Sequence, residues 1–273
     1  MFNPHDASVS MPEAPIVVMT DLDGTLLDHD TYSTVKAAPT LKRLHELRIP
    51  LIFNTSKTHA EVKTLKQDMD IRYPHVCENG SAIYLDDYHK PVILGSKIKD
   101  IIKVLAQLRR DGFLFRSFND MPASEVTAIT GLTLNKSTLA KARVATEPML
   151  WQGNDAERVQ FQAALGDHDL KLLKGGRFWH VMGPTDKSEG VHFLRQHYQS
   201  LWQRSPIIIA LGDGENDRAM LEAADFPIVI PGKHATLTLK NTNTRTAIHH
   251  GPKGWHDELA PLIERLLKEN RSG

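Results

Sequence analysis

The sequence predicts an α/β protein in which a doubly wound, mostly parallel sheet is interrupted by an inserted α+β module. Three observations support this class. Apolar strand-like runs alternate with helical patterns in both end regions of the chain, the pattern changes between them, and three apolar runs end in polar side chains. We therefore expect a core domain of residues 1–87 and 184–273 and an inserted domain of residues 88–183.

Strands and helices alternate over the first part of the core. The apolar, β-branched residues 16–18 predict a buried strand. A helix is expected at 38–47, because proline suits its first turn and leucines recur there every three residues. A second apolar strand at 51–53 and a second helix at 59–69 continue the alternation. This order is typical of a parallel sheet that is covered by helices.

The pattern changes after a turn in the next segment. Strands at 76–78 and 82–85 are joined by Asn79-Gly80, a pair that favours tight hairpin turns. Beyond them, the insert is expected to mix helices with short strands. The expected helices are 97–110, 123–130, 136–144 and 155–165, and the expected strands are 113–117, 145–151, 170–173 and 178–182.

The alternation of strand and helix resumes at residue 187, which predicts that the chain returns to a Rossmann-like, doubly wound core. The segment 240–253 is polar and contains glycine, which indicates a surface loop. The expected elements are helices at 187–199, 216–224 and 255–269, with strands at 206–213 and 227–230.

Composition excludes several classes of protein. The 33 basic and 33 acidic residues give a formal net charge of zero, which argues against a nucleic-acid partner. The single cysteine, Cys77, excludes an internal disulfide and fits a reducing, cytoplasmic setting. Residues 1–14 lack a secretory pattern and are expected to form a loose tail, and no apolar run approaches the ~18 residues of a membrane span. The oligomeric state is not predicted.

Side chains that suit phosphate chemistry follow three of the predicted strands. Because ligands of parallel sheets bind beyond the carboxyl ends of the strands, we expect these side chains to converge. They are Asp21 and Asp23, then Thr55 and Ser56, then Asp213 and Asp217.

The acidic residues suggest a magnesium site and a nucleophile. Carboxylate oxygens suit Mg²⁺, so Asp21 and Asp213, with the carbonyl of Asp23, are the expected ligands. Asp217 is placed outside them, where it accepts hydrogen bonds from metal-bound water or holds Lys187. Asp21 is the candidate nucleophile, because a carboxylate that attacks phosphorus gives an aspartyl-phosphate. Asp23 is the candidate general acid and base.

Thr55, Ser56 and Lys187 are the candidate phosphate-binding residues, because two precede a predicted helix and the third supplies an ammonium group. Structural alternatives remain for each. Thr55 or Ser56 also suits a helix N-cap, Lys187 a surface position, and Asp217 the first turn of a helix. The run GDGEND also resembles a dinucleotide fingerprint, but Asp217 in place of its last glycine would repel a pyrophosphate.

Taken in order, these motifs resemble those of the haloacid dehalogenase-like phosphatases. DLDGT is similar to the first motif, Thr55 to the second, Lys187 to the third, and GDGEND to the fourth. The resemblance implies a magnesium-dependent phosphomonoesterase with an aspartyl-phosphate intermediate. The insert resembles in position the α/β cap of one subgroup, in which the cap closes over the core and selects the substrate.

A narrower resemblance is to the mannosyl-3-phosphoglycerate phosphatase family, through the runs NTSKT, ENGS, EPMLW and GGRFWHVMG. It implies hydrolysis of mannosyl-3-phosphoglycerate to mannosylglycerate and phosphate. For the carboxylate of such a substrate we expect Arg177, helped by His180 or Lys57. Arg177 and His180 point to opposite sides of a regular strand, so their joint action requires a twist or bulge.

Trp151 and Asn79 complete the expected substrate-binding residues. Trp151 suits stacking on a sugar face, although a tryptophan at a strand end also suits a protein core. Asn79 alternatively shapes the turn after residue 78. Rival functions are a glucosyl-3-phosphoglycerate phosphatase, a general sugar-phosphate phosphatase, a phosphomutase, and a phosphate-binding module without catalysis.

Overall fold

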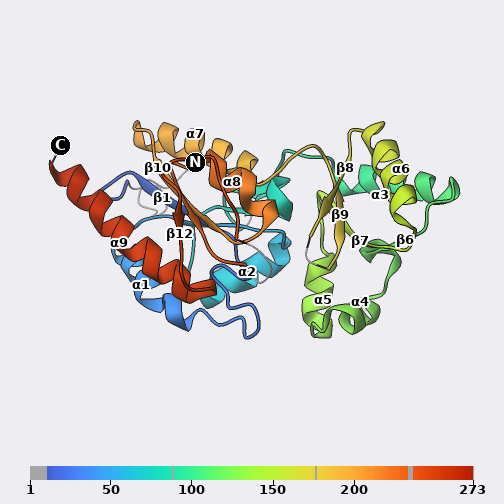
Figure 1. Ribbon diagram of the computed structural model, residues 1–273, viewed down its shortest axis with the longest axis horizontal. Coiled ribbons are helices and arrows are strands. Elements are labelled where there is room, and N and C mark those ends of the chain that lie inside the picture. Colours follow the sequence, from blue (N-terminus) through green and yellow to red (C-terminus); the bar gives the residue numbers. More distant parts are fainter. Residues whose placement is uncertain (1–10, 88, 176, 233–235, 273) are drawn as a thin grey trace. The chain divides into compact units, whose positions relative to one another are not determined.

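The computed structural model describes residues 11–87, 89–175, 177–232 and 236–272 (Figure 1). The chain forms two compact units. The first comprises Met1–Thr55, Ile71–His75 and Lys187–Gly273, and the second comprises Ser56–Asp70 and Val76–Asp186. The predicted domain limits at 87/88 and 183/184 stay a prediction.

The predicted loose tail covers residues 1–14, of which the first ten lie outside the described residues. The last residues of this segment are held in place. Ala14 is fully buried, and the Glu13 carboxylate forms an ion pair with Arg271 near the end of the last helix.

The first unit contains a parallel sheet with the strand order β12-β11-β10-β1-β2. In the register of this sheet, Ile16 of β1 lies opposite Ile207 of β10, and Val18 lies opposite Leu51 of β2. Its central strands are apolar and buried, as expected for a sheet that is covered on both faces. The strands are β1 (Ile16–Thr20), β2 (Leu51–Asn54), β10 (Ile207–Gly212), β11 (Phe226–Val229) and β12 (Arg245–Thr246).

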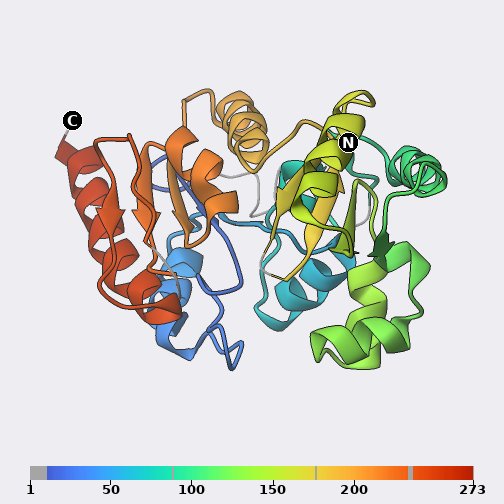
Figure 2. The same ribbon diagram turned by 45° about the vertical axis from the view of Figure 1, so that its right-hand side comes forward.

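Helices cover both faces of this sheet. In Figures 1 and 2, α7 (Ser188–Trp202) and α8 (Arg218–Ala223) lie on one face, and α1 (Ala38–Glu46) and α9 (Gly251–Ser272) lie on the other. Trp255 of α9 is fully buried. This arrangement confirms the predicted doubly wound α/β class. Among the described residues, no helix has both the length and the apolar character needed to cross a membrane.

Two expectations about the end of the chain need correction. The last helix begins at Gly251 instead of residue 255, and β12 lies within the segment expected to be a loop. Both elements are supported by packing that a local pattern does not show, since β12 pairs with β11 and the buried side chains of α9 begin at its first turn.

The second unit contains α2 (His59–Asp68), the strands β4 (Ala82–Tyr84) and β5 (Val92–Ile93), and all of β3 (His75–Cys77) except its first residue. Thr58 caps α2 through a capping box with Glu61. The expected tight turn at Asn79-Gly80 is present within the short turn η2 (Glu78–Gly80): Asn79 and Gly80 both have positive φ, at 55° and 92°, and the Ser81 N–H donates to the Glu78 carbonyl oxygen at 3.2 Å. The left-handed conformation of Glu78 itself, with φ of 55°, was not expected.

The rest of this unit is an antiparallel four-stranded sheet, with the order β6-β7-β9-β8, together with four α-helices. One face of the sheet packs against α3 and α6 through residues such as Leu105, Met149 and Phe161. A smaller apolar cluster lies around α4 and α5 and includes Phe118 and Val126. The elements are α3 (Ile98–Arg110), β6 (Phe115–Ser117), α4 (Ala123–Thr130), α5 (Leu134–Lys141), β7 (Thr146–Trp151), α6 (Asp155–Gly166), β8 (Lys171–Lys174) and β9 (Trp179–Met182).

The helix predicted at 136–144 begins and ends earlier. Thr133 is its N-cap and accepts a hydrogen bond from the backbone N–H of Lys136 at 3.3 Å. Short 3₁₀ turns also lie outside the α-helices, namely η1 (Val35–Ala37), η3 (Phe118–Asp120) and η4 (Glu215–Asp217).

Candidate active site

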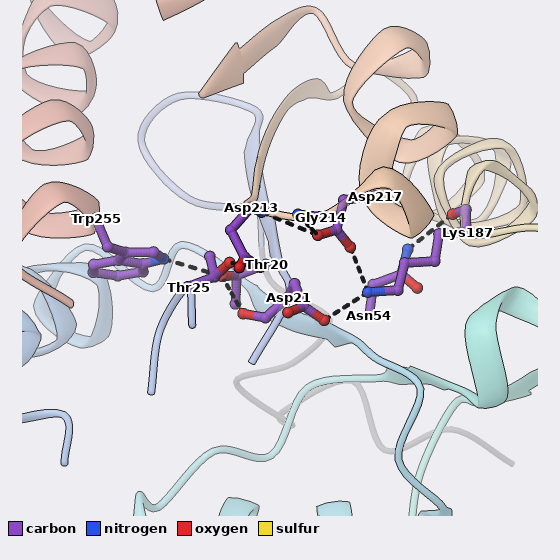
Figure 3. Close-up of polar contacts among 9 residues, drawn as sticks. All are labelled: Thr20, Asp21, Thr25, Asn54, Lys187, Asp213, Gly214, Asp217 and Trp255. Atoms are coloured by element: carbon purple, nitrogen blue, oxygen red, sulfur yellow. Dashed lines mark hydrogen bonds and ion pairs between the residues drawn. The ribbon is translucent and has the colours of Figure 1, made fainter. Parts of the chain in front are cut away.

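A buried lysine lies between two aspartates at the carboxyl end of the parallel sheet in the first unit (Figure 3). Asp21 directly follows β1, Lys187 directly precedes α7, and Asp217 ends the 3₁₀ turn that follows β10. Lys187 Nζ lies 2.6 Å from Asp21 Oδ1 and 2.5 Å from Asp217 Oδ1. Lys187 and Asp217 are fully buried. The structure therefore brings together three of the predicted site residues from distant parts of the sequence.

Asp217 is fully engaged by groups of the protein. One oxygen is paired with Lys187, and Oδ2 accepts hydrogen bonds from the backbone N–H groups of Asp213 at 3.0 Å and Gly214 at 2.9 Å. Asp217 thus orients both the lysine and the loop that carries Asp213. Since both of its oxygens already accept hydrogen bonds, Asp217 is poorly suited to bind a metal directly.

Asp213 lies against the turn that follows β1. Its Oδ1 accepts a hydrogen bond from Thr25 Oγ1 at 3.1 Å. Gly24 makes room for the other oxygen, since a Cβ at this position would lie 2.7 Å from Asp213 Oδ2. Gly24 also has a φ of +83°, which L-residues with a side chain rarely adopt. The DLDGT turn therefore positions Asp213 through a hydrogen bond from Thr25 and through the space that Gly24 leaves for its carboxylate.

The donor atoms of this cluster suit a hard divalent cation. Ligand oxygens of Asp21, Asp213 and Asp217 all lie within 4.8 Å of one another. Magnesium prefers oxygen ligands and commonly takes one or two carboxylates from the protein. Because Asp217 is occupied by Lys187 and backbone N–H groups, Asp21 and Asp213 are the residues that fit such an ion.

The electrostatics of the cluster point the same way. Burial raises the pKa of Asp21 well above its usual range, Lys187 opposes this shift, and the neighbouring carboxylates of Asp217, Asp213 and Asp23 add to it. Burial and Asp217 raise the pKa of Asp213 to about 6. Burial alone would lower the pKa of Lys187, but Asp21 and Asp217 outweigh it and raise the pKa. The site thus gathers more negative charge than Lys187 balances, which favours a bound cation.

Three further residues support this cluster and were not assigned a role from the sequence. Asn54 Nδ2 donates to the carbonyl oxygen of Lys187 at 2.8 Å. Thr20 Oγ1 donates to the carbonyl oxygen of Asp21 at 2.7 Å and accepts from Trp255 Nε1 at 3.1 Å. Asn54 lies directly before Thr55 at the end of a predicted strand, so its place near the site could have been inferred from the sequence. The contact of Trp255 with Thr20 is apparent only from the fold.

The other predicted residues near the strand ends are placed as follows. Asp23 is partly buried and forms an isolated β-bridge with Leu27. Thr55 is buried at the end of the first segment of the first unit. Ser56 begins the second unit, where its carbonyl oxygen accepts a hydrogen bond from Arg143 Nη1 at 3.1 Å. Their roles in acid–base chemistry and phosphate binding stay predictions.

The expected substrate-binding residues of the second unit are dispersed. Arg177 is exposed, and its Nη1 donates to the carbonyl oxygens of Ile129 and Thr130 at the end of α4. Trp151 packs on the ring of Phe161, with centroids 5.1 Å apart, on the face that α3 and α6 cover. The two side chains therefore belong to different parts of this unit, and their roles in substrate binding stay predictions.

Three more of these residues have buried or backbone roles. The carbonyl oxygen of Lys57 accepts a hydrogen bond from the N–H of Glu78 at 3.1 Å. Asn79 is buried in the left-handed turn after β3. His180 lies on β9 with 8% of its surface exposed. The roles of these three residues in substrate binding also stay predictions.

Comparison with known proteins gives matches in both sequence and fold. Residues 18–158 match the family described as haloacid dehalogenase-like hydrolase. A protein of Methanococcoides burtonii named glucosyl-3-phosphoglycerate/mannosyl-3-phosphoglycerate phosphatase is 35% identical over 264 residues, which covers 90% of this chain and 97% of that protein.

Solved structures share the fold at low sequence identity. A Thermoplasma acidophilum protein has a TM-score of 0.66 and 17% identity, and the match covers 93% of this chain and 98% of that chain. A phosphatase of the haloalkanoate superfamily from Bacteroides thetaiotaomicron has a TM-score of 0.66 and 15% identity, over 97% of this chain and 98% of that chain. At these identities the two matches show the fold alone.

Proposed function

This chain belongs to the haloacid dehalogenase-like hydrolases, and on that premise we propose that it is a magnesium-dependent mannosyl-3-phosphoglycerate phosphatase. Its class is that of a phosphoric monoester hydrolase. The observation that carries the proposal is the arrangement of Asp21, Lys187 and Asp213. The 35% identity to a relative named for this activity supports the choice of substrate.

In the proposed reaction, Asp21 is the nucleophile. A carboxylate oxygen of Asp21 attacks phosphorus, the bond to the glycerate oxygen breaks, and an aspartyl-phosphate forms. Asp23 donates a proton to the departing oxygen and then takes one from the water that hydrolyses the acyl-phosphate. The aspartyl-phosphate thus returns to Asp21 and inorganic phosphate.

The remaining residues of the site orient the phosphate and balance its negative charge. Lys187, held between Asp21 and Asp217, keeps positive charge beside the nucleophile and favours the carboxylate form that attack requires. Thr55 and Ser56 supply hydroxyl and N–H donors for phosphate oxygens. Asp21, Asp213 and the carbonyl of Asp23 would hold Mg²⁺, which when bound neutralises the repulsion between the phosphate and these carboxylates.

The second candidate substrate is glucosyl-3-phosphoglycerate, because the name of the Methanococcoides burtonii relative includes it. The two substrates share the phosphate and the glycerate carboxylate and differ only in the sugar. We further propose that the inserted segment, residues 88–183, selects between such substrates as a cap domain.

The test is phosphate release from a panel of phosphomonoesters. The panel contains both glycosyl-3-phosphoglycerates, mannose 6-phosphate and p-nitrophenyl phosphate, each with Mg²⁺ and again with a chelator. We expect kcat/KM to be highest for a glycosyl-3-phosphoglycerate and activity to disappear on chelation. Equal kcat/KM across the panel would favour a general sugar-phosphate phosphatase. No release from any compound would favour the phosphate-binding module.

A further inference from the structure

The four-stranded sheet of the second unit has two chemically different faces. Residues that lie opposite each other on antiparallel strands point to the same side of a sheet. Met149 and Val181 point to the face that α3 and α6 cover. Side chains alternate between the two faces along each strand, so His180 and Met182 of β9 point to the other face. Thr146 and Lys171 both lie opposite Met182, on β7 and β8, and therefore point to this face as well.

Arg143 lies beside this second face, in the segment between α5 and β7. Its Nε donates to the carbonyl oxygen of Ala140 at 3.1 Å. Its Nη1 donates to the carbonyl oxygen of Ser56 at 3.1 Å and to Thr146 Oγ1 at 3.0 Å. These three bonds fix the plane of the guanidinium group, which carries five N–H donors in all.

The guanidinium group keeps both donors on Nη2. Among the described residues, Nη2 has no hydrogen-bond acceptor and Arg143 forms no direct ion pair. The carboxylate of Glu78 is linked to Arg143 through Thr146 Oγ1, which donates to Glu78 Oε2 at 2.8 Å. A positioned, partly buried arginine that forms no direct ion pair and keeps two donors on Nη2 is a suitable receptor for a carboxylate, which guanidinium groups bind through paired N–H donors.

His180 adds a second group without a partner. With 8% of its surface exposed, it is more than nine-tenths buried, and its Nδ1 has no hydrogen-bond partner among the described residues. A Cβ on Gly175 would lie 3.0 Å from His180 Nε2, so only a glycine lets the chain pass this close to that edge of the ring. Leaving a buried polar group unpaired is costly, and a ligand oxygen would remove part of that cost.

The charge of Arg143 also affects the pKa of His180. Burial lowers the pKa of His180 to about 3, and the charge of Arg143 contributes to the same shift. The imidazole is therefore neutral at physiological pH, so that it can serve as a hydrogen-bond donor or acceptor beside a cation. A neutral ring together with a guanidinium group that forms no direct ion pair suits an anion that also bears hydroxyl groups.

We propose that Arg143 and His180 form a binding subsite for the carboxylate and neighbouring oxygens of a glycerate group. This inference rests on the proposed function, because it identifies which residues of the second unit read the organic part of the substrate. It moves the role of carboxylate receptor from Arg177 to Arg143. The guanidinium of Arg177 is exposed and lies on carbonyl oxygens that end α4, whereas that of Arg143 is held in place with two free donors.

The test compares substrates with and without a carboxylate in matched variants. Arg143→Met removes the charge and keeps an apolar stem of similar reach. We expect it to lower kcat/KM for mannosyl-3-phosphoglycerate roughly 10- to 100-fold, as the loss of charge-assisted hydrogen bonds predicts. For p-nitrophenyl phosphate, kcat/KM should change by less than about 3-fold, because no carboxylate contact is lost.

Companion variants separate recognition from folding. Arg143→Lys should restore only part of the loss, since an ammonium keeps the charge without the planar pair of donors. Arg110→Met is the matched control, because Arg110 is exposed on α3 and donates to Gln107. His180→Gln should raise KM for the glycerate substrate more than it changes kcat. Thermal unfolding of each variant shows whether its fold persists.

If Arg143→Met does not fold, or if the protein shows no turnover, the subsite is tested by a binding measurement on the unmodified protein. Titration calorimetry should show binding of 3-phosphoglycerate at least about 10-fold tighter than of glycerol 3-phosphate, which lacks the carboxylate. Equal affinity for the two compounds, or equal loss of kcat/KM for both substrates in Arg143→Met, would overturn the subsite. In both cases phosphate release by the unmodified protein would leave the proposed function standing. Failure of all phosphate release would refute that function, and the calorimetry would still decide the subsite.

Discussion

Gly24 lies against the carboxylate of Asp213, so closely that a Cβ on Gly24 would be 2.7 Å from Asp213 Oδ2. Gly24→Ala should therefore displace Asp213, weaken Mg²⁺ binding and lower kcat/KM by about 100-fold, because displacement of a catalytic group by ~1 Å has an effect of this size. Steady-state kinetics over a series of Mg²⁺ concentrations measures both effects.

Gly131→Ala is the matched control for that substitution. Gly131 has a similar φ of +76° but nothing within 4 Å of the added Cβ. It therefore carries the same backbone strain, roughly 1 kcal/mol, without contact with the site. Unchanged Mg²⁺ dependence in Gly24→Ala, or equal loss of activity in both variants, would contradict the positioning role of Gly24.

Asp21→Asn should abolish turnover and leave the fold intact. The amide keeps the shape of the side chain but lacks the nucleophilic charge, so we expect kcat to fall at least about 1,000-fold. Acid quenching followed by mass spectrometry should detect a phosphorylated peptide in the unmodified enzyme and none in the variant. The control is Asp257→Asn, at a partly exposed carboxylate on α9 that pairs with Lys253. A phosphorylated peptide in Asp21→Asn would rule out this nucleophile.

Lys187→Met should destabilise the first unit, because it leaves the buried carboxylates of Asp21 and Asp217 without their shared cation. Removing one partner of a buried ion pair costs roughly 3–5 kcal/mol, whereas Lys253→Met at an exposed pair should cost less than about 1 kcal/mol. Urea unfolding at pH 7 measures both. Adding Asp217→Asn to Lys187→Met should recover part of the loss, and no recovery would argue against charge imbalance as the cause.

His180 should make the protein less stable as pH falls. Burial, with a contribution from Arg143, lowers the pKa of His180 in the folded state to about 3, against 6.5 as the ordinary value. Between these values the unfolded chain binds a proton that the folded chain does not, so stability declines as pH drops below about 6.5. At pH 5 this single group should cost roughly 2 kcal/mol of unfolding free energy.

The corresponding measurement is urea unfolding at pH 7.5 and pH 5 for the unmodified protein and for His180→Gln. Glutamine keeps a polar side chain without titrating, so the difference between the two pH values should shrink by roughly 2 kcal/mol in the variant. His197→Gln is a useful comparison, since burial also lowers the pKa of His197. An identical pH dependence with and without His180 would mean that folding does not lower the pKa of this ring.

Much of the fold follows from short-range patterns in the sequence. The apolar run 16–18 and the leucines of α1 predict elements that the structure contains, because burial on a sheet and on one helix face needs those periodicities. The late strand β12 and the left-handed turn at Glu78 were not predicted. β12 depends on pairing with β11, and the turn depends on hydrogen bonds from Val144, Ala145 and Thr146 to the Glu78 carboxylate.

The site was predictable where strand order alone brings groups together. Asp21 and Asp213 follow neighbouring parallel strands, so their proximity follows from the topology once β1 and β10 pair. Arg143 was not identified, because its three fixing bonds involve two backbone carbonyl oxygens and a hydroxyl, and none has a sequence signature. Arg177 was predicted as the carboxylate receptor because it lies in the run GGRFWHVMG, whereas in the structure its side chain contacts the end of α4.

The hydrogen bonds from Trp255 to Thr20 and from Thr25 to Asp213 span 235 and 188 positions of the chain. During synthesis on a ribosome, at ~5–20 residues per second, the strand that carries Asp21 emerges roughly 10–40 s before Asp213 exists to meet it. The central partner of this apolar strand, β10, is equally late. We therefore expect the intervening segment to become compact first, while β1 lacks one of its two neighbouring strands until translation is nearly complete.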